Sequence, residues 1–255
     1  MPRSNRYMQP GHIYHLTHRC HNRQFLLRHR RDRTEYGARL RNAIHKHKVS
    51  LFNFCITCNH VHLIAMCDQR GGLSRFMQEL EGEFAEHYNW RKHRSGSFWG
   101  GRFSSTMIEG GEHLWNCLRY IDLNMVRANV VSHPRDWIWC GYKEIVGERK
   151  RYCLLDTNRL VHLLGLRDRA MFAAIHQERV MESIRDRRLS RESLWTESIA
   201  VGSEAFINEI ANKNKWRKRI QRGITDAETF YIKENSAVYS RLKIRKAPPK
   251  NSCKR

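Results

Sequence analysis

Hydrophobic and polar positions follow two different periods along the first half of the chain. Strand-like runs of β-forming residues extend over His12 to Cys20, Leu51 to Cys58, Val61 to Met66 and Arg102 to Glu109. Helical spacing of apolar residues marks Asp32 to Lys48, Leu73 to Tyr88 with Ser74 as a candidate N-cap, and Glu112 to Arg127. This order predicts an α+β fold, with a ferredoxin-like split βαβ core, an antiparallel sheet and one added helix.

The second half of the chain changes to a helical pattern. An apolar patch at residues 160–164 is followed by a helical segment from Ala170 to Arg185, and Ser203 is a candidate N-cap for a further helix. The last fifteen residues contain no acidic residue and include Pro248 and Pro249, which predicts a basic disordered tail. We therefore expect a first domain at 1–147, a helical extension at 148–240 and a tail at 241–255.

The net charge of the sequence indicates which class of partner the protein binds. The 255 residues contain 47 Lys and Arg against 25 Asp and Glu, a net charge of +22. The excess is not confined to a tail, because residues 1–150 carry 24 basic and 13 acidic residues and the remainder carries 23 and 12. An anionic partner is expected, and nucleic acid is the commonest one.

The apolar runs and the cysteines indicate in which cellular compartment the protein is expected. No apolar run approaches the roughly 18 residues of a membrane span, and no apolar segment follows the basic start, so we expect a cytoplasmic protein without a membrane partner. The eight cysteines are scattered through apolar runs, which favours free core thiols over disulfides.

The pair His60 and His62 is the first candidate for chemistry. Residues two apart on a strand share one face, so the two imidazoles would point the same way while Val61 points to the core. That arrangement is half of a metal site. His45 and His47 have the same spacing but fall in a predicted helix, where they diverge. Two histidines with ordinary structural partners are the alternative interpretation.

Neighbouring cysteines and histidines are weaker candidates. A flat strand places Cys55 and Cys58 on opposite faces, so they do not converge with the histidine pair into a zinc site. Histidines also recur every third residue through the first predicted strand, at His12, His15, His18 and His21. Because such positions alternate between faces, we expect no polyhistidine site there, and at most one or two of these side chains facing DNA.

The second candidate is the helix from Glu112 to Arg127. Its apolar stripe consists of Leu114, Leu118, Ile121 and Met125. At 100° per residue, Tyr120, Asn124 and Arg127 cluster on a flank of that stripe. A tyrosine nucleophile, an amide ligand and an arginine that contacts phosphate would form a usable set. A tyrosine at the edge of a core is the commoner interpretation of the same pattern.

Five colinear motifs give these candidates a context. They are Gly11-His-Ile-Tyr-His-Leu-Thr-His-Arg-Cys-His-Asn-Arg-Gln-Phe25, Asn59-His-Val-His-Leu63, Phe98-Trp-Gly-Gly-Arg-Phe103, Leu118-Arg-Tyr-Ile-Asp-Leu-Asn-Met-Val-Arg-Ala128 and Trp137-Ile-Trp-Cys-Gly-Tyr142. Together they resemble the REP-associated tyrosine transposases, of the single-tyrosine, HUH-type superfamily, over about residues 8–147. Many relatives carry Pro in place of Met125 and Ser in place of Cys140, and neither position is expected to touch the chemistry.

The resemblance implies a single-tyrosine endonuclease and strand transferase that acts on single-stranded, hairpin-bearing (REP-like) DNA. Tyr120, on the added catalytic helix, would be the nucleophile, and the product a 5′-phosphotyrosine link with a free 3′-OH. His60 and His62 would be the paired ligands of Mg²⁺ or Mn²⁺, with Asn124 as a third polar ligand. The expected protein is a monomer or homodimer associated with the nucleoid.

Further residues are candidates for DNA contacts. Trp99 is a candidate for stacking on bases, and Arg102, Arg119 and Arg127 for holding phosphates. A later basic run is a candidate for the duplex stem of a hairpin, and it comprises Lys213, Trp216, Arg217, Lys218 and Arg219. Core aromatics and a solvated basic face are the alternatives.

Two other functions fit part of the sequence. A domesticated sequence-specific DNA-binding protein would keep the fold and lose cleavage. An RNA-binding module on a ferredoxin-like sheet would need exposed stacking aromatics in strand motifs, and the nearest match, Phe52 and Phe54, lacks the Lys/Arg-Gly-Phe context.

Overall fold

Four antiparallel strands form the centre of the fold. The structure is a computed structural model that describes residues 8–213, 220–225 and 228–234. Strands β1 (Ile13–Arg19), β2 (Ser50–Ile56), β3 (His60–Met66) and β4 (Ser104–Ile108) pair in the order β2-β3-β1-β4. Helices α1 (Arg30–His47) and α2 (Gly72–Arg91) make the two crossovers. The predicted ferredoxin-like split βαβ core is confirmed.

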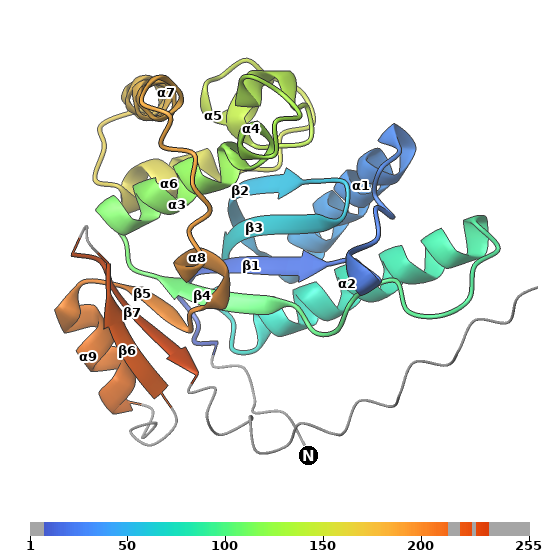
Figure 1. The fold of residues 1–255 in the computed structure, drawn as a ribbon, viewed down its shortest axis with the longest axis horizontal. Coiled ribbons are helices and arrows are strands. Elements are labelled where there is room, and N and C mark those ends of the chain that lie inside the picture. The colour runs from blue at the N-terminus through green and yellow to red at the C-terminus, as the bar shows by residue number, and fades with distance from the viewer. Residues whose placement is uncertain (1–7, 214–219, 226–227, 235–255) are drawn as a thin grey trace, which may run out of the picture.

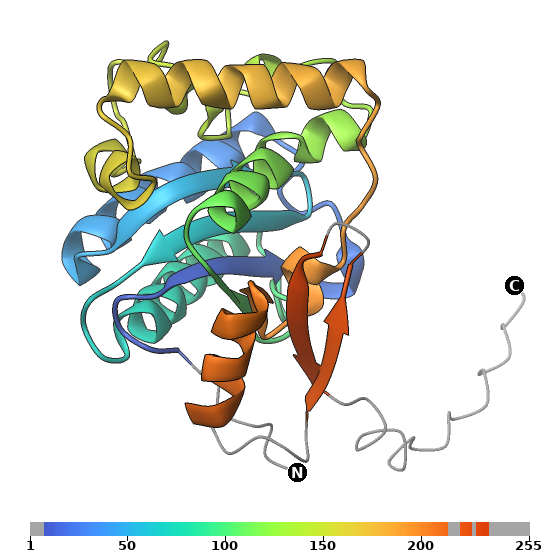
Figure 2. The ribbon, with the colours of Figure 1, turned by 90° about the vertical axis from the view of Figure 1, so that its left-hand side faces the viewer.

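The two faces of this sheet bury separate cores. Leu16, Val61 and Leu63 pack with α1 and α2 in one cluster of buried residues. Phe52 and Ile64 pack in a second cluster, with the helix α3 (Glu112–Asp122), which lies on the opposite face (Figure 2). Successive strand residues point to opposite faces, so each strand serves both cores.

Two predicted helix boundaries need correction. The expected helix from Glu112 to Arg127 is divided into α3 and α4 (Asn124–Arg127) by Leu123, whose ψ of 1° lies outside the α-helical range. The division is mild, because the Leu123 amide still donates to the Arg119 carbonyl at 3.0 Å. Ser74 is not the N-cap of α2. Gly71 precedes the helix with a φ of 71°, a conformation that favours glycine.

The extension at 148–240, which the sequence predicts to be helical, contains strands as well as helices. Helix α5 (Tyr142–Ile145) lies just before it, and its own helices are α6 (Thr157–Leu163), α7 (Arg169–Arg185), α8 (Leu194–Glu197) and α9 (Glu204–Lys213). Strand β5 (Ala200–Gly202) pairs parallel with β4, and the hairpin of β6 (Ile220–Ile224) and β7 (Phe230–Glu234) extends the sheet to β2-β3-β1-β4-β5-β7-β6 (Figure 1). A three-residue strand is too short to show a period in the sequence.

Smaller features complete the fold. Short 3-10 helices cover His21–Arg23 and Pro134–Asp136. Ser203 caps α9 as expected, since its Oγ accepts from the Phe206 amide at 3.3 Å. The described cysteines are all free. Within the described ranges, no helix has both the length and the apolar character needed to cross a bilayer. The predicted tail at 241–255 lies outside the described residues.

A buried polar contact holds α3 in place. The His176 imidazole on α7 lies 2.7 Å from the Asp122 carboxylate on α3, and both side chains are fully buried. Asn53 on β2 donates to the same carboxylate at 3.0 Å and to the Leu118 carbonyl at 3.2 Å. One carboxylate therefore joins the sheet, α3 and α7, and it fixes the helix that carries Tyr120.

Removal of this carboxylate should destabilise the fold strongly. Asp122→Ala leaves the buried His176 Nε2 without its partner and removes one of the two hydrogen bonds that the Asn53 amide donates, and we expect a loss of about 3 kcal/mol or more in the free energy of unfolding. Glu112→Ala is a matched control, because the exposed Glu112–Arg179 ion pair also joins α3 to α7. We expect it to cost less than about 1 kcal/mol. Urea unfolding measures both, and equal losses would contradict the assignment.

Candidate active site

The pairing of β1 with β3 builds one wall of the site. In this antiparallel ladder Thr17 lies opposite His62 and Arg19 lies opposite His60. Residues directly opposite one another share a face, so these four side chains lie together on the face covered by α3. Val61 is buried in the opposite core, as the sequence predicts.

Both histidines have a hydrogen-bond partner at Nδ1, and His62 has a second one at Nε2. The Nδ1 atom of His60 lies 2.7 Å from Asn59 Oδ1 and 2.9 Å from Thr57 Oγ1, in the turn between β2 and β3. The Nδ1 atom of His62 lies 2.8 Å from Nε2 of His15, and its Nε2 atom lies 3.1 Å from the Asn124 amide nitrogen. The two rings stand edge to face with centroids 4.8 Å apart. The structure therefore brings His60, His62 and Asn124 together.

Burial keeps both imidazoles neutral. It lowers the pKa of His60 to about 3 and the pKa of His62 well below its usual value, and the positive charges of Arg19 and Arg127 lower both further. A neutral imidazole is the form that binds a metal ion, since the ligand must be deprotonated.

Tyr120 lies on α3 beside these histidines. Its ring centroid is 6.2 Å from those of His62 and His15. The Arg127 guanidinium lies 4.1 Å from the Tyr120 ring centroid and donates to the Tyr120 carbonyl at 2.7 Å. Burial raises the pKa of the Tyr120 phenol, and Arg127 and Arg191 oppose that shift. Tyr120, Asn124 and Arg127 thus share one flank of the helix, as their spacing predicts.

A basic pocket of about 350 Å³ opens onto the histidines. The residues that line it include His60, His62, Arg19, Arg23, Arg102 and Arg191. Guanidinium groups from separate parts of the chain therefore surround one cavity, which suits an anionic ligand.

Several residues of this site were not expected from the sequence. The run of histidines through the first strand gave no prediction for His15, which becomes recognisable only when the register of β1 against β3 is known. Arg191 and Trp195 come from the segment around α8, and no motif marks them. The indole of Trp195 lies with its ring centroid 6.2 Å from that of Tyr120.

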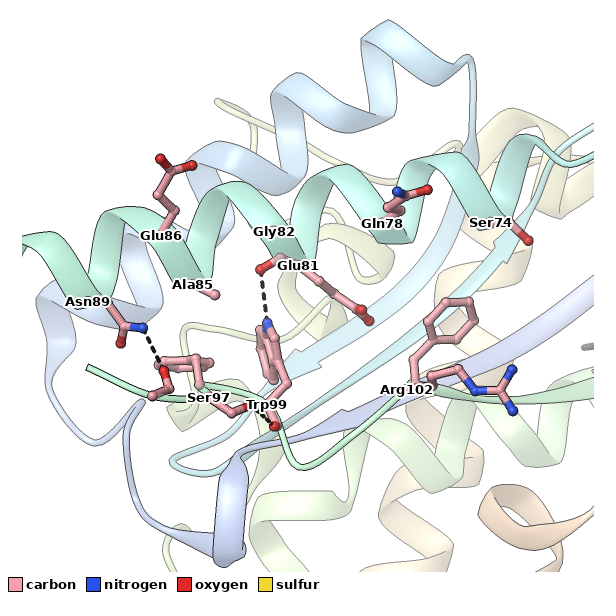
Figure 3. A pocket seen from close by; sticks show the side chains of 13 residues that line it. Ser74, Gln78, Glu81, Gly82, Ala85, Glu86, Asn89, Ser97, Trp99 and Arg102 are labelled. Atoms are coloured by element: carbon pink, nitrogen blue, oxygen red, sulfur yellow. Dashed lines mark hydrogen bonds between the residues drawn. The ribbon is translucent and has the colours of Figure 1, made fainter. Parts of the chain in front are cut away.

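Trp99 lies in the core rather than in the basic pocket. Its ring stacks on His18 with centroids 4.1 Å apart, and its indole N–H donates to the Glu81 carbonyl of α2 at 3.0 Å (Figure 3). Only 8% of the residue is exposed, and it contributes to the lining of a second pocket beside α2 rather than to that of the basic pocket. Arg102 is exposed and lines both the basic pocket and this second pocket of about 530 Å³ (Figure 3).

Two further candidates for DNA contact, Arg119 and Lys213, do not line the basic pocket. Arg119 is half-buried on α3, and Lys213 at the end of α9 pairs with Glu209. The other residues of the predicted basic run, Trp216, Arg217, Lys218 and Arg219, lie outside the described residues, so the stem contact stays a prediction.

The residues at the site could hold a divalent cation only through neutral donors. Over the part of the chain that the structure describes, no group of three or more His, Cys, Asp or Glu side chains is placed to hold a metal. The set at the site is instead two neutral imidazoles and one amide, since both Nδ1 atoms are already engaged and Asn124 lies at Nε2 of His62. Such neutral ligands suit a cation whose charge is balanced by a bound anion.

A family model described as "Transposase IS200 like" matches residues 9–124. The match extends from before β1 to the start of α4 and includes His60, His62, Tyr120 and Asn124. Residues 9–124, which make up less than half of the chain, are therefore similar to the transposases of the IS200-like family.

Two solved structures show a weaker likeness. One is a REP-associated tyrosine transposase bound to a REP hairpin, 22% identical, with 58% of this chain and 86% of that chain covered and a TM-score of 0.48. The other is a provisionally assigned transposase from Deinococcus radiodurans R1, 16% identical, with 51% and 98% covered and a TM-score of 0.34. Comparison with curated proteins gave no match. The assignment of function therefore depends on the family match and on the geometry of the site.

Substitution of two tryptophans, one buried and one exposed, distinguishes a core role of Trp99 from a binding role. Trp99→Ala should cost about 3–5 kcal/mol in the free energy of unfolding, because it removes a buried ring and leaves a cavity. Trp90→Ala is the control, since Trp90 is 75% exposed on α2 and should change stability by less than about 0.5 kcal/mol. Denaturant unfolding measures both. An unchanged stability for Trp99→Ala, together with weaker binding of a single-stranded oligonucleotide, would instead support the predicted role of Trp99 in stacking on bases.

Proposed function

We propose that the protein is a metal-dependent single-stranded DNA endonuclease and strand transferase that forms a 5′-phosphotyrosine intermediate on hairpin, REP-like DNA. The observation that carries this proposal is the convergence of three elements on one face of the sheet. The imidazole of His62 on β3 lies 3.1 Å from the amide of Asn124 on α4, and 6.2 Å separates its ring centroid from that of Tyr120 on α3.

The reaction is a balanced exchange of phosphodiester bonds. The Tyr120 phenol oxygen attacks the scissile phosphorus and loses its proton. The bond from phosphorus to the 3′ oxygen of the preceding nucleotide breaks, and this oxygen takes up one proton, so the numbers of bonds and protons are unchanged. The products are a phosphotyrosine ester on the 5′ side and a free 3′-OH. Attack by a 3′-OH on that ester releases Tyr120 and joins two strands without ATP, because the number of phosphoester bonds is unchanged.

His60, His62 and Asn124 would hold Mg²⁺ or Mn²⁺. When bound, such an ion polarises the phosphate and stabilises the charge that develops on the leaving oxygen. Burial raises the pKa of the Tyr120 phenol, and the guanidinium of Arg127 at its ring favours the phenolate. Arg127 thus lowers the cost of the charged nucleophile.

The arginines of the basic pocket would bind the strand around the scissile phosphate. Arg19, Arg102 and Arg191 line that pocket with His60 and His62, so a backbone phosphate in it would meet several positive charges. Beyond this pocket, the extension from residue 148 and the basic run at 213–219 would contact the hairpin stem. We propose that the protein acts in the cytoplasm on nucleoid DNA, as a monomer or a homodimer.

Binding without cleavage is the alternative function. The deep burial of the Tyr120 ring, which is 4% exposed, also suits a phenol that packs and never reacts. A domesticated DNA-binding protein would keep the basic pocket and form no covalent intermediate.

Substitution of the nucleophile separates the two functions. Wild-type protein incubated with single-stranded hairpin DNA and Mg²⁺ or Mn²⁺ should give a covalent protein–DNA band on a denaturing gel, and Tyr120→Phe should give none while it still binds the DNA. Tyr152→Phe is the matched control, because Tyr152 is 77% exposed and its ring contacts Arg41 on α1 rather than the residues of the site. A covalent band from Tyr120→Phe would contradict the assignment of the nucleophile. Binding without any band from the wild type would favour the alternative.

Metal and DNA should strengthen each other's binding. The proposed ligands are neutral, and Arg19, Arg127 and Arg191 place positive charge near His60, so an anionic phosphate is needed to balance a divalent cation. In the Tyr120→Phe variant, we expect the Mn²⁺ Kd to fall by about fivefold or more when a hairpin oligonucleotide is bound, as measured by electron paramagnetic resonance. An oligonucleotide with an uncharged methylphosphonate at the scissile position should lose this effect. Equal Mn²⁺ affinity with and without DNA would contradict the coupling.

A further inference from the structure

Both ring nitrogens of His15 are engaged beneath the proposed metal ligands. His15 is 1% exposed on β1. Its Nδ1 atom lies 2.7 Å from the main-chain carbonyl oxygen of Trp195 on α8, and its Nε2 atom lies 2.8 Å from Nδ1 of His62. The two imidazole rings stack with centroids 5.0 Å apart. A continuous chain of hydrogen bonds therefore runs from α8 through β1 to β3, and α8 lies close to β1 and β4 (Figure 1).

The carbonyl of Trp195 determines which atoms donate and which accept along this series of hydrogen bonds. A carbonyl oxygen only accepts hydrogen bonds, so Nδ1 of His15 must carry a proton. A second proton on Nε2 would create a charged imidazolium without exposure to water, which is costly. Nε2 of His15 is therefore an acceptor, and Nδ1 of His62 must donate to it. This leaves the lone pair of His62 on Nε2, the atom that lies 3.1 Å from the Asn124 amide.

We propose that His15 is a positioning residue that holds His62 in the tautomer whose Nε2 lone pair faces the cation, and that the Trp195 carbonyl sets this tautomer through His15. The inference rests on the proposed function, in which Nε2 of His62 is a metal ligand. Trp195 lies beyond the matched residues 9–124, so the extension contributes to the metal site without supplying a ligand. Partners of this kind fix the tautomer and orientation of a ligating histidine.

His60 provides an internal comparison, because its tautomer does not depend on α8. Its Nδ1 atom lies 2.7 Å from the side-chain oxygen of Asn59, the residue before it in the same turn. Removal of His15 should therefore disturb His62 and leave His60 unchanged. A general loosening of the sheet would disturb both.

Tautomer assignment tests the inference without metal or activity. In wild-type protein with ¹⁵N-labelled histidine, long-range ¹H–¹⁵N spectra should show His15 and His62 protonated at Nδ1 and unprotonated at Nε2. His62 protonated at Nε2 would overturn the proposal. The spectra need no substitution, so they decide the question even if a variant fails to fold.

A pair of substitutions tests the consequence for metal binding. His15→Phe keeps a planar ring and removes the acceptor, so we expect His62 to lose its single tautomer and the Mn²⁺ Kd to rise by about 10–100-fold. His15→Gln offers an amide oxygen to His62 and should stay within a few-fold of wild type. The His60 tautomer should be the same in both. Wild-type Mn²⁺ affinity in His15→Phe would overturn the proposal.

A third variant separates failure of this inference from failure of the proposed function. His62→Ala should abolish specific Mn²⁺ binding if His62 is a ligand. Unchanged Mn²⁺ binding in His62→Ala would contradict the proposed metal site, and with it the positioning role of His15. Loss of binding in His62→Ala together with wild-type binding in His15→Phe would keep the proposed metal site and reject only the positioning role.

Discussion

The register of β1 against β3 is the constraint on which the site depends. His62 lies opposite Thr17, and Arg19 lies opposite His60. A shift of one residue would turn both histidines into the core beneath α1 and α2 and would expose Val61 and Leu63 to the other face. Burial of the apolar residues in two separate cores therefore fixes the position of the polar ones. The chemistry of this face follows from the packing of the opposite face.

Helix α3 completes the site because it is anchored away from the chemistry. The fully buried contact of Asp122 with His176 and Asn53 joins α3 to α7 and β2. Tyr120 is two residues before Asp122, so its ring position is set by a contact on another side of the same helix. The mild break at Leu123 then leads into α4, where the Asn124 amide lies at hydrogen-bond distance from His62.

The extension is part of the site and of the sheet. Its strand β5 pairs with β4, and the segment around α8 brings Arg191 to the basic pocket and the Trp195 carbonyl to His15. Part of the excess positive charge in the second half of the chain thus lies beside the first half. The same positive charges lower the pKa of His60, and they favour a phosphate in the pocket over a free cation.

Local patterns in the sequence determined the core elements, the shared face of His60 and His62, and the shared flank of Tyr120, Asn124 and Arg127. Those features depend only on the period of a strand or a helix, which neighbouring residues reveal. Tertiary structure alone decided that Trp99 is buried against His18, that a three-residue strand extends the sheet, and that His15 meets His62 and Trp195. These contacts join residues distant in the sequence, and their geometry depends on how strands and helices pack. No local period encodes that packing, so the hydrogen bonds that hold the proposed metal ligand could be found only in the folded protein.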